Sequence, residues 1–301
     1  MTESQSAANR RGIAAMVLSG AFFLANDTLV KVASESLPTA ELLFVRGVLS
    51  VVCVLGLAAA FGALPRLGDV AKPAVLIRAA TDVAATFAYL IALFHAPIAN
   101  VTAINLASPL MLTAFAVFVL KENVGWRRWS AVSVGFLGVL LIVRPASEGF
   151  DAYALLAAFA MVLHTTRDLL TRRIDKATPS IVVSLGTALG VTLVAGAGTA
   201  VEGFRALDFR EWAILIGASV GLTGGYYFLI VATRTGEVSA VQPFRYMALL
   251  WALIAGWSVW DQLPDALGWT GYALLVASGL YVFHRENVRA KEAAAASAPK
   301  A

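Results

Sequence analysis

Apolar residues dominate the chain in long runs, and short polar stretches separate each run from the next. Each run holds about 20 mainly apolar residues, which is the length an α-helix needs to cross the hydrocarbon core of a bilayer. The pattern predicts an all-helical membrane protein with ten transmembrane helices. Their approximate bounds are 12–34, 38–62, 72–95, 97–120, 126–143, 151–173, 179–201, 211–233, 237–260 and 268–284.

The second half of the chain repeats the first at an offset of about 141 residues. The most similar matches are Asp27 with Asp168, Leu29 with Leu170, Lys31 with Arg172 and Pro38 with Pro179. Because five crossings return the chain on the other side of the membrane, the second copy is inverted. Inverted repeats are the architecture of many secondary transporters, with the substrate site at the repeat interface. We therefore predict two five-helix domains, 12–143 and 151–284, and a cytoplasmic tail over 285–301, which is expected to be disordered over 291–301.

Composition agrees with a membrane protein. Hydrophobic residues make up 59% of the chain and charged residues 14%, whereas soluble domains carry about 25% charged residues. The single cysteine, Cys53, excludes a disulfide within the chain, and three histidines are too few for a metal cluster. We expect no metal and no cofactor.

The basic residues in the loops and near the ends of the predicted spans are unequally distributed. One set of loops contains most of them, whereas the opposite side receives Lys31, Arg144, Arg205 and Arg210. The positive-inside rule then places both termini in the cytoplasm of a multi-pass protein of the bacterial inner membrane. Topology accounts for the basic residues, so we expect no nucleic-acid partner. The expected partners are lipid and a small-molecule substrate, and the expected state is a monomer, with a dimer as the alternative.

Several segments resemble the EamA-type branch of the drug/metabolite transporter superfamily. They are LLFVRG (42–47) after Pro38, ALFHAPIANVTAINLASP (92–109) and GFLGVLLIV (135–143), echoed by ATRTGEVSAVQPF (232–244) and WTGYALLVASG (269–279). The resemblance implies a transporter with a central cavity between spans 1, 3, 4, 6, 8 and 9, and with spans 5 and 10 at the periphery. Thr187 occupies the position that matches Arg46, so the second half lacks that arginine.

Ionisable residues within the spans require a reason, since each costs about 2.5–3.5 kcal/mol at the bilayer centre. Two oppositely charged pairs lie four residues apart, which allows mutual neutralisation: Asp27 with Lys31, and Arg78 with Asp82. Asp82 lies roughly 15 Å into its span, at the midplane. A structural ion pair and a cavity-lining Asp82 both fit this position. For Asp27 and its repeat mate Asp168, helix bridging is favoured over substrate contact.

His164 also falls near the midplane, where an imidazole is able to bind a substrate; packing is the alternative. Pro109 and Pro243 interrupt spans 4 and 9, and each frees a backbone carbonyl. We predict hinges at both prolines, with free carbonyls that bind ligand; static bending is the alternative. The full set of predicted substrate-binding residues is Asn26, Asp82, Asn105, Ser108, His164, Tyr227, Arg245 and Tyr246.

The sequence shows no catalytic constellation and no phosphate-binding glycine loop, which disfavours a membrane-embedded enzyme. No ATP-binding domain is evident either, so transport is expected to be passive or ion-coupled. We predict an alternating-access exporter of aromatic or hydrophobic amino acids, because aromatic side chains and mid-depth polar groups suit a ring plus a zwitterion. The alternative is another metabolite such as S-adenosylmethionine, because FFLANDTLVKVASESLP (22–38) resembles the first span of that subgroup.

Overall fold

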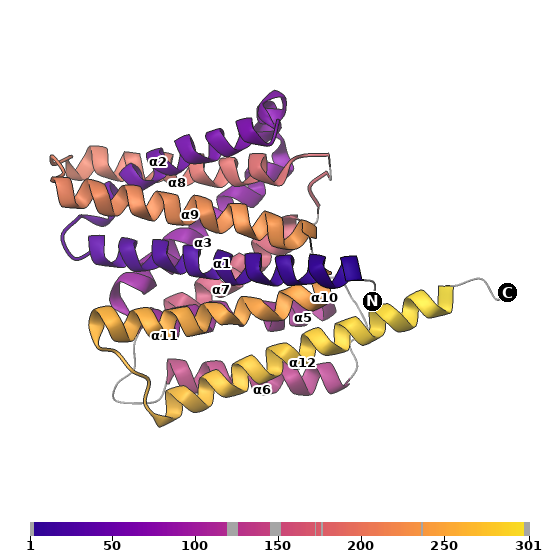
Figure 1. The fold of residues 1–301 in the computed structure, drawn as a ribbon. Coiled ribbons are helices and arrows are strands. Elements are labelled where there is room, and N and C mark those ends of the chain that lie inside the picture. The colour runs from indigo at the N-terminus through magenta and orange to yellow at the C-terminus, as the bar shows by residue number, and fades with distance from the viewer. Residues whose placement is uncertain are drawn as a thin grey trace.

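The computed structural model describes residues 3–118, 126–144, 152–171, 173–175, 177–235 and 237–297, and every regular element in these ranges is a helix. The helices run back and forth along one bundle, and both chain termini lie at the same end (Figure 1). The α-helices are α1 (Glu3–Ala33), α2 (Thr39–Ala60), α3 (Pro73–His95), α4 (Ile98–Asn105), α5 (Ser108–Phe118), α6 (Trp126–Val143), α7 (Ala152–Thr171), α8 (Ser180–Glu202), α9 (Phe209–Thr235), α10 (Val238–Val241), α11 (Met247–Trp260) and α12 (Ala266–Ser297). The 3₁₀ helices are η1 (Leu64–Ala71) and η2 (Gln242–Tyr246).

Helices from opposite halves of the chain pack against each other. The largest contacts join α1 to α9, α3 to α7, α2 to α8 and α6 to α12. A two-fold relation between five-helix halves exchanges the first two pairs and maps each of the other two onto itself. The pairing is the one expected for inverted repeats. The domain bounds stay a prediction, because residues 145–151 lie outside the described ranges, as does Arg172.

Eight stretches of the described residues are long and apolar enough to cross a membrane, with α4 and α5 counted together over Ile98–Phe115. The expected spans 5 and 9 are missing from this set. The apolar part of α6 is the shorter stretch Trp129–Val143, and span 9 is divided into α10, η2 and α11. Ten crossings therefore remain a prediction.

Two helix boundaries show where local sequence decides the structure. Pro38 and Pro179, which are repeat mates, directly precede α2 and α8 and act as their N-cap residues. At the other end of the chain, α12 continues to Ser297. The prediction of a disordered tail is therefore wrong for residues 291–297, where a run of alanine, the best helix former, prolongs the helix.

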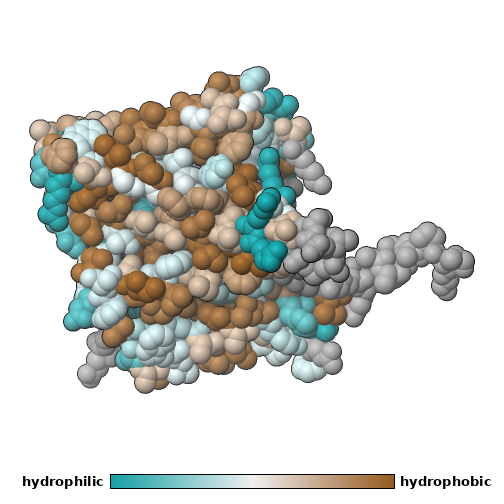
Figure 2. All heavy atoms as spheres, viewed as in Figure 1, coloured by the Kyte–Doolittle hydropathy of each residue, from teal (hydrophilic) through white to brown (hydrophobic). Residues whose placement is uncertain are grey.

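Apolar side chains cover the middle of the face seen in Figure 2, and hydrophilic ones gather toward the two ends of the helices. Large hydrophobic residues are well exposed on several helices, including Val52 at 63% and Leu193 at 72%. Side chains of this kind are stable on the outside of a bundle when lipid covers them.

Glycines allow two of the helix pairs to approach closely. A Cβ atom at Gly221 of α9 would lie 3.0 Å from the backbone of Phe22 and Asn26 in α1. Between α6 and α12, a Cβ atom at Gly138 would lie 2.7 Å from the carbonyl oxygen of Gly271. Small residues at such crossings are typical of membrane bundles. The α1–α9 contact holds the polar segment of α1 in place.

Candidate functional site

A cavity of about 640 Å³ lies at the centre of the bundle. Its wall is built by α1, α2, α3, α4 and α5 from the first half and by α7, α8, α9, η2 and α11 from the second, whereas no described residue of α6 or α12 lines it. Spans 5 and 10 are therefore peripheral, as the resemblance implied, and spans 2 and 7 join the wall. The volume lies within the range of roughly 300–1,000 Å³ that small-molecule sites occupy.

The cavity brings together most of the residues that the sequence singled out, from both halves of the chain. Those that line it are Asn26, Asp82, Asn105, Ser108, His164 and Arg245. Neither predicted hinge proline is a lining residue, although each directly follows one that is.

Two predicted binding residues lie elsewhere. Tyr227 is 41% exposed and stacks on Phe61, with the ring centroids 6.3 Å apart. Tyr246 is buried, and its ring lies 6.4 Å from that of Phe283. Tyr226 lines the cavity in place of Tyr227, because consecutive helical residues point about 100° apart.

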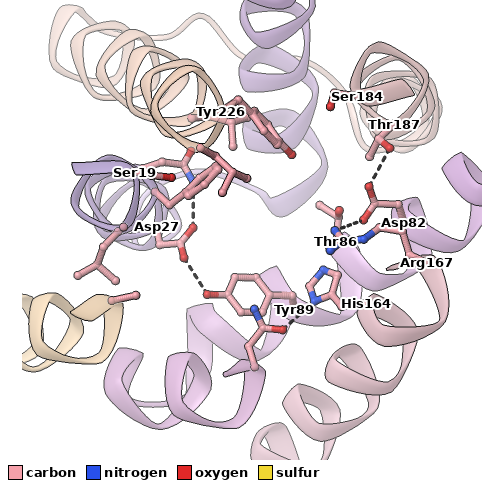
Figure 3. A pocket seen from close by; sticks show the side chains of 18 of the residues that line it. Ser19, Asp27, Asp82, Thr86, Tyr89, His164, Arg167, Ser184, Thr187 and Tyr226 are labelled. Carbon is pink, nitrogen blue, oxygen red and sulfur yellow. Dashed lines mark hydrogen bonds and ion pairs between the residues drawn. The ribbon is translucent and has the colours of Figure 1, made fainter. Parts of the chain in front are cut away.

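Asp82 is the centre of a buried ion cluster, which we call the Asp82 cluster and define as Arg78, Asp82, Arg167 and Thr187. One carboxylate oxygen of Asp82 lies 2.9 Å from Arg78 Nη1, and the other lies 2.8 Å from Arg167 Nη1. The Thr187 hydroxyl donates to Asp82 at 2.8 Å. Both interpretations of Asp82 thus hold, since it is paired with Arg78 and also lines the cavity (Figure 3).

Asp27 has a different environment on the opposite wall. Its carboxylate accepts hydrogen bonds from the Tyr89 hydroxyl at 2.7 Å and from the Asn26 amide at 2.8 Å. Among the described residues no lysine or arginine lies within 4.0 Å of it, so the predicted pair with Lys31 is wrong. Arg46 Nη1 instead donates to the Asn26 side-chain oxygen at 3.2 Å. Figure 3 shows Asp27 and Tyr89 facing the central space.

His164 projects into the cavity between these two groups. Its Nδ1 atom lies 2.9 Å from Asn105 Oδ1, and its ring centroid lies 5.8 Å from that of Tyr89. On the α1 and α9 side of the cavity, the rings of Phe23 and Tyr226 meet edge to face, with their centroids 5.2 Å apart. The cavity therefore offers aromatic surfaces beside both groups of charges, which suits a ligand with a ring and polar ends.

The two interrupted passes differ from the predicted hinges in one respect. Pro109 has no N–H to donate to the Asn105 carbonyl, but the Ser108 hydroxyl donates to that oxygen at 2.6 Å. The freed carbonyl therefore already accepts one hydrogen bond, and ligand binding at this oxygen stays a prediction. Pro243 lies within η2, where a 3₁₀ segment replaces the α-helix. The first interrupted pass breaks at residues 106–107, between α4 and α5. At the repeat offset this position matches the junction of η2 and α11 in the second interrupted pass.

The two ends of the cavity are not alike. Its wall includes Ser180 at the start of α8 and Thr233 near the end of α9, both exposed at the end of the bundle that holds the termini. At the opposite end, Lys31 Nζ donates to the backbone oxygens of Leu93, at 2.7 Å, and Ala96. The charge of Lys31 also lies 5.3 Å from the ring centroid of Trp260. These contacts hold α1 against the end of α3, beyond Asp27 and Leu90, the last lining residues of these two helices toward this end.

Several lining residues escaped the sequence interpretation. Arg167, Tyr89 and Thr86 are the clearest cases. The last two were detectable, because Arg78, Asp82, Thr86 and Tyr89 recur at helical spacing along one face of α3. Among the described residues, no group of three or more potential metal ligands is close enough to hold an ion.

A helical bundle with bilayer-length apolar segments, pairing between opposite halves and a polar central cavity is typical of one class of membrane protein, the solute transporters. Residues 10–144 match the EamA-like transporter family. The match covers a little under half of the chain, and together with the fold and the cavity it supports a membrane transporter of the EamA type.

Relatives of the chain are transporters with several different substrates. A riboflavin transporter of Brucella anthropi is 27% identical over 70% of this chain and 76% of that protein. An S-adenosylmethionine uptake transporter of Rickettsia prowazekii is 25% identical over 64% of this chain and 65% of its own length. The pseudopaline exporter CntI of Pseudomonas aeruginosa is 27% identical over 89% of this chain and 94% of its own length. A solved crystal structure with 19% identity and a TM-score of 0.61 covers 92% of this chain and 96% of that chain, and it supports the fold alone.

Proposed function

We propose that the protein is a secondary transporter of the bacterial inner membrane that moves a small organic metabolite by alternating access. The observation that carries this proposal is the polar central cavity, which reaches one end of the bundle and stops short of the Lys31 contacts at the other. A solute enters such a cavity from one side and leaves when the other end parts. The bacterial sources of the relatives support the inner membrane.

We further propose that both termini face the cytoplasm, so that this conformation is open to the inside. The uneven distribution of basic residues supports this orientation. We also propose a monomer as the working unit.

The substrate we favour is an aromatic or hydrophobic amino acid moved outward. The rings of Phe23, Tyr89 and Tyr226 supply apolar surface, and Asp27 and Arg46 supply charges of both signs. A ring together with a zwitterion matches this combination. Direction is not encoded in the cavity itself, so export rests on the proposed substrate.

S-adenosylmethionine is the second candidate, because it also joins an amino-acid end to an aromatic ring. A cavity of about 640 Å³ lies in the middle of the range for drug-sized ligands and admits a metabolite larger than one amino acid. The similarity to uptake transporters for this compound supports the same choice.

Counterflow into proteoliposomes tests these proposals. Vesicles preloaded with one unlabelled compound are mixed with its radiolabelled form, using tryptophan, phenylalanine, S-adenosylmethionine, riboflavin and a nucleoside in turn. Exchange above protein-free vesicles is expected for tryptophan or S-adenosylmethionine. Exchange of riboflavin alone would reject both favoured substrates, and exchange of no compound would count against the proposed function. Efflux from cells loaded with an aromatic dipeptide then tests the outward direction.

A further inference from the structure

One wall of the cavity presents two opposite charges that are held apart. Asn26 lies between them, donating from Nδ2 to Asp27 Oδ1 at 2.8 Å and accepting from Arg46 Nη1 at 3.2 Å. The Tyr89 hydroxyl holds the second oxygen of Asp27. All four side chains line the cavity. A neutral amide thus fixes the positions of a carboxylate and a guanidinium that do not contact each other.

The two charges have unused hydrogen-bonding capacity. Arg46 is only 6% exposed, and its side chain makes this one hydrogen bond among the described residues, although a guanidinium carries five donors. Its Nε atom is buried without a partner. Asp27 has neutral donors only. A buried charge such as that of Arg46 is normally paired, so Arg46 and the partly buried Asp27 on the same cavity wall are suited to bind the charges of a ligand.

The second half of the chain supplies an internal comparison. The repeat mates of Asn26 and Asp27 are Arg167 and Asp168, which pair directly at 2.8 Å. The mate of Arg46 is the neutral Thr187, which donates to Asp82. The second half therefore neutralises its charges within the protein. The first half keeps the same carboxylate position but replaces the neighbouring cation by an amide, and it adds an arginine one helix away.

We propose that Asp27 and Arg46 bind the ammonium and the carboxylate of an α-amino-acid group on the substrate. This assignment rests on the proposed transport function and narrows it to amino acids and metabolites that carry an amino-acid end. The ring of the substrate then lies against Phe23, Tyr89 and Tyr226, which all line the cavity. Figure 3 shows Tyr89 and Tyr226 at its wall. Charge-assisted hydrogen bonds of this type are stronger than neutral ones and select for ligand geometry.

The test uses probes that differ from tryptophan by one charged group. Tryptamine lacks the carboxylate, and indole-3-propionate lacks the ammonium. Initial counterflow rates are measured for the full-length protein, for Asp27→Asn and for Arg46→Gln. Asp265→Asn is the matched control, because it makes the same change in a carboxylate that pairs with Arg144 outside the cavity and is 56% exposed. Thermal unfolding of each purified variant shows whether it is folded, and Arg46→Lys and Asp27→Glu serve as milder alternatives.

The expected result is a crossed pattern. Wild type should prefer tryptophan over both analogues by about tenfold or more, which corresponds to the loss of one hydrogen bond to a charged group. Asp27→Asn should abolish the preference over indole-3-propionate and keep the preference over tryptamine, and Arg46→Gln should do the reverse. Asp265→Asn should behave as wild type. A uniform loss for all probes would mean that the two residues are structural, and the proposal would be overturned.

A second series extends the test to larger substrates. S-adenosylmethionine is compared with 5′-methylthioadenosine, which keeps the ring and lacks the amino-acid end. Equal exchange of the two compounds would overturn the proposal and leave the transport function standing. Exchange of riboflavin, with no exchange of any probe that carries an amino-acid end, would likewise overturn the proposal and leave the transport function standing. Absence of all exchange would reject the proposed function, and the amino-acid assignment with it.

Discussion

Replacing Asp82 by asparagine removes the negative charge that Arg78 and Arg167 share. Loss of one partner from a fully buried ion pair costs about 3–5 kcal/mol. Here Arg167 keeps Asp168, and the side chain of Arg78 keeps its hydrogen bonds to Thr171 and Thr187. We therefore expect the lower end of that range, a loss of about 3 kcal/mol in the free energy of unfolding.

Asp168→Asn is the matched control, since Asp168 contacts the same arginine. Its side chain is 43% exposed, whereas that of Asp82 is 4% exposed. An exposed ion pair contributes about 0–1 kcal/mol, so this substitution should cost less than 1 kcal/mol. Combining Asp82→Asn with Arg78→Gln removes one of the positive charges left unbalanced. The double variant should recover roughly 1–2 kcal/mol, within the range for directly interacting residues.

Unfolding of the purified protein by sodium dodecyl sulfate in mixed micelles, followed by tryptophan fluorescence, measures these differences. Equal losses for Asp82→Asn and Asp168→Asn would refute the distinction between buried and exposed pairs at this site. If Asp82→Asn left stability unchanged but reduced substrate binding, Asp82 would act mainly as a ligand residue, as the sequence had suggested.

Four further outcomes are expected. Lys31→Met should loosen the contact of α1 with the end of α3. A membrane-impermeant maleimide should then label an Ala96→Cys variant, made in a Cys53→Ala background, more strongly. Unchanged labelling would show that Lys31 does not hold this end of the bundle together. His164→Ala should weaken substrate affinity roughly three- to twelve-fold, the effect of one lost hydrogen bond, with folding retained; unchanged transport would place it in the packing. Pro243→Ala should stay folded but turn over more slowly in counterflow, whereas wild-type turnover would mean a static bend. A C-terminal green fluorescent protein fusion should fluoresce and an alkaline phosphatase fusion should be inactive, and the reverse would refute the orientation.

The helical class and the pairing of the two halves could be predicted because both depend on one-dimensional patterns. Apolar runs of bilayer length predict helices directly, and repeat mates such as Pro38 and Pro179 begin equivalent helices. The continuity of a pass was harder to predict. Pro109 and Pro243 do not align in the repeat, yet the breaks in the two passes do. The Ser108 hydroxyl compensates the first proline, and a 3₁₀ segment surrounds the second, so the position of a proline alone does not predict where the helix breaks.

The site was only partly predictable because its contacts join distant helices. Spacing by four residues identified the Arg78–Asp82 pair, but the same rule failed for Asp27 and Lys31. Lysine has a long side chain, and backbone acceptors at the end of α3 bind it in place of the nearby carboxylate. No local pattern links Asp27 to Tyr89 on another helix. In the run 226–228, sequence alone does not fix which ring faces inward.

At the end of the bundle where Lys31 lies, the contacts between α1 and α3 can be broken at low cost. The acceptors of Lys31 are the oxygens of Leu93 and Ala96 at the last turn of α3, where carbonyls lack helical partners. If α1 moves away, water that enters the gap is able to hydrate both these oxygens and the ammonium, so neither side is left unsatisfied. An ion pair buried in the core, such as the Asp82 cluster, lacks this compensation. Access should therefore alternate at the helix ends, while the Asp82 cluster stays intact and anchors α3 to α7 and α8.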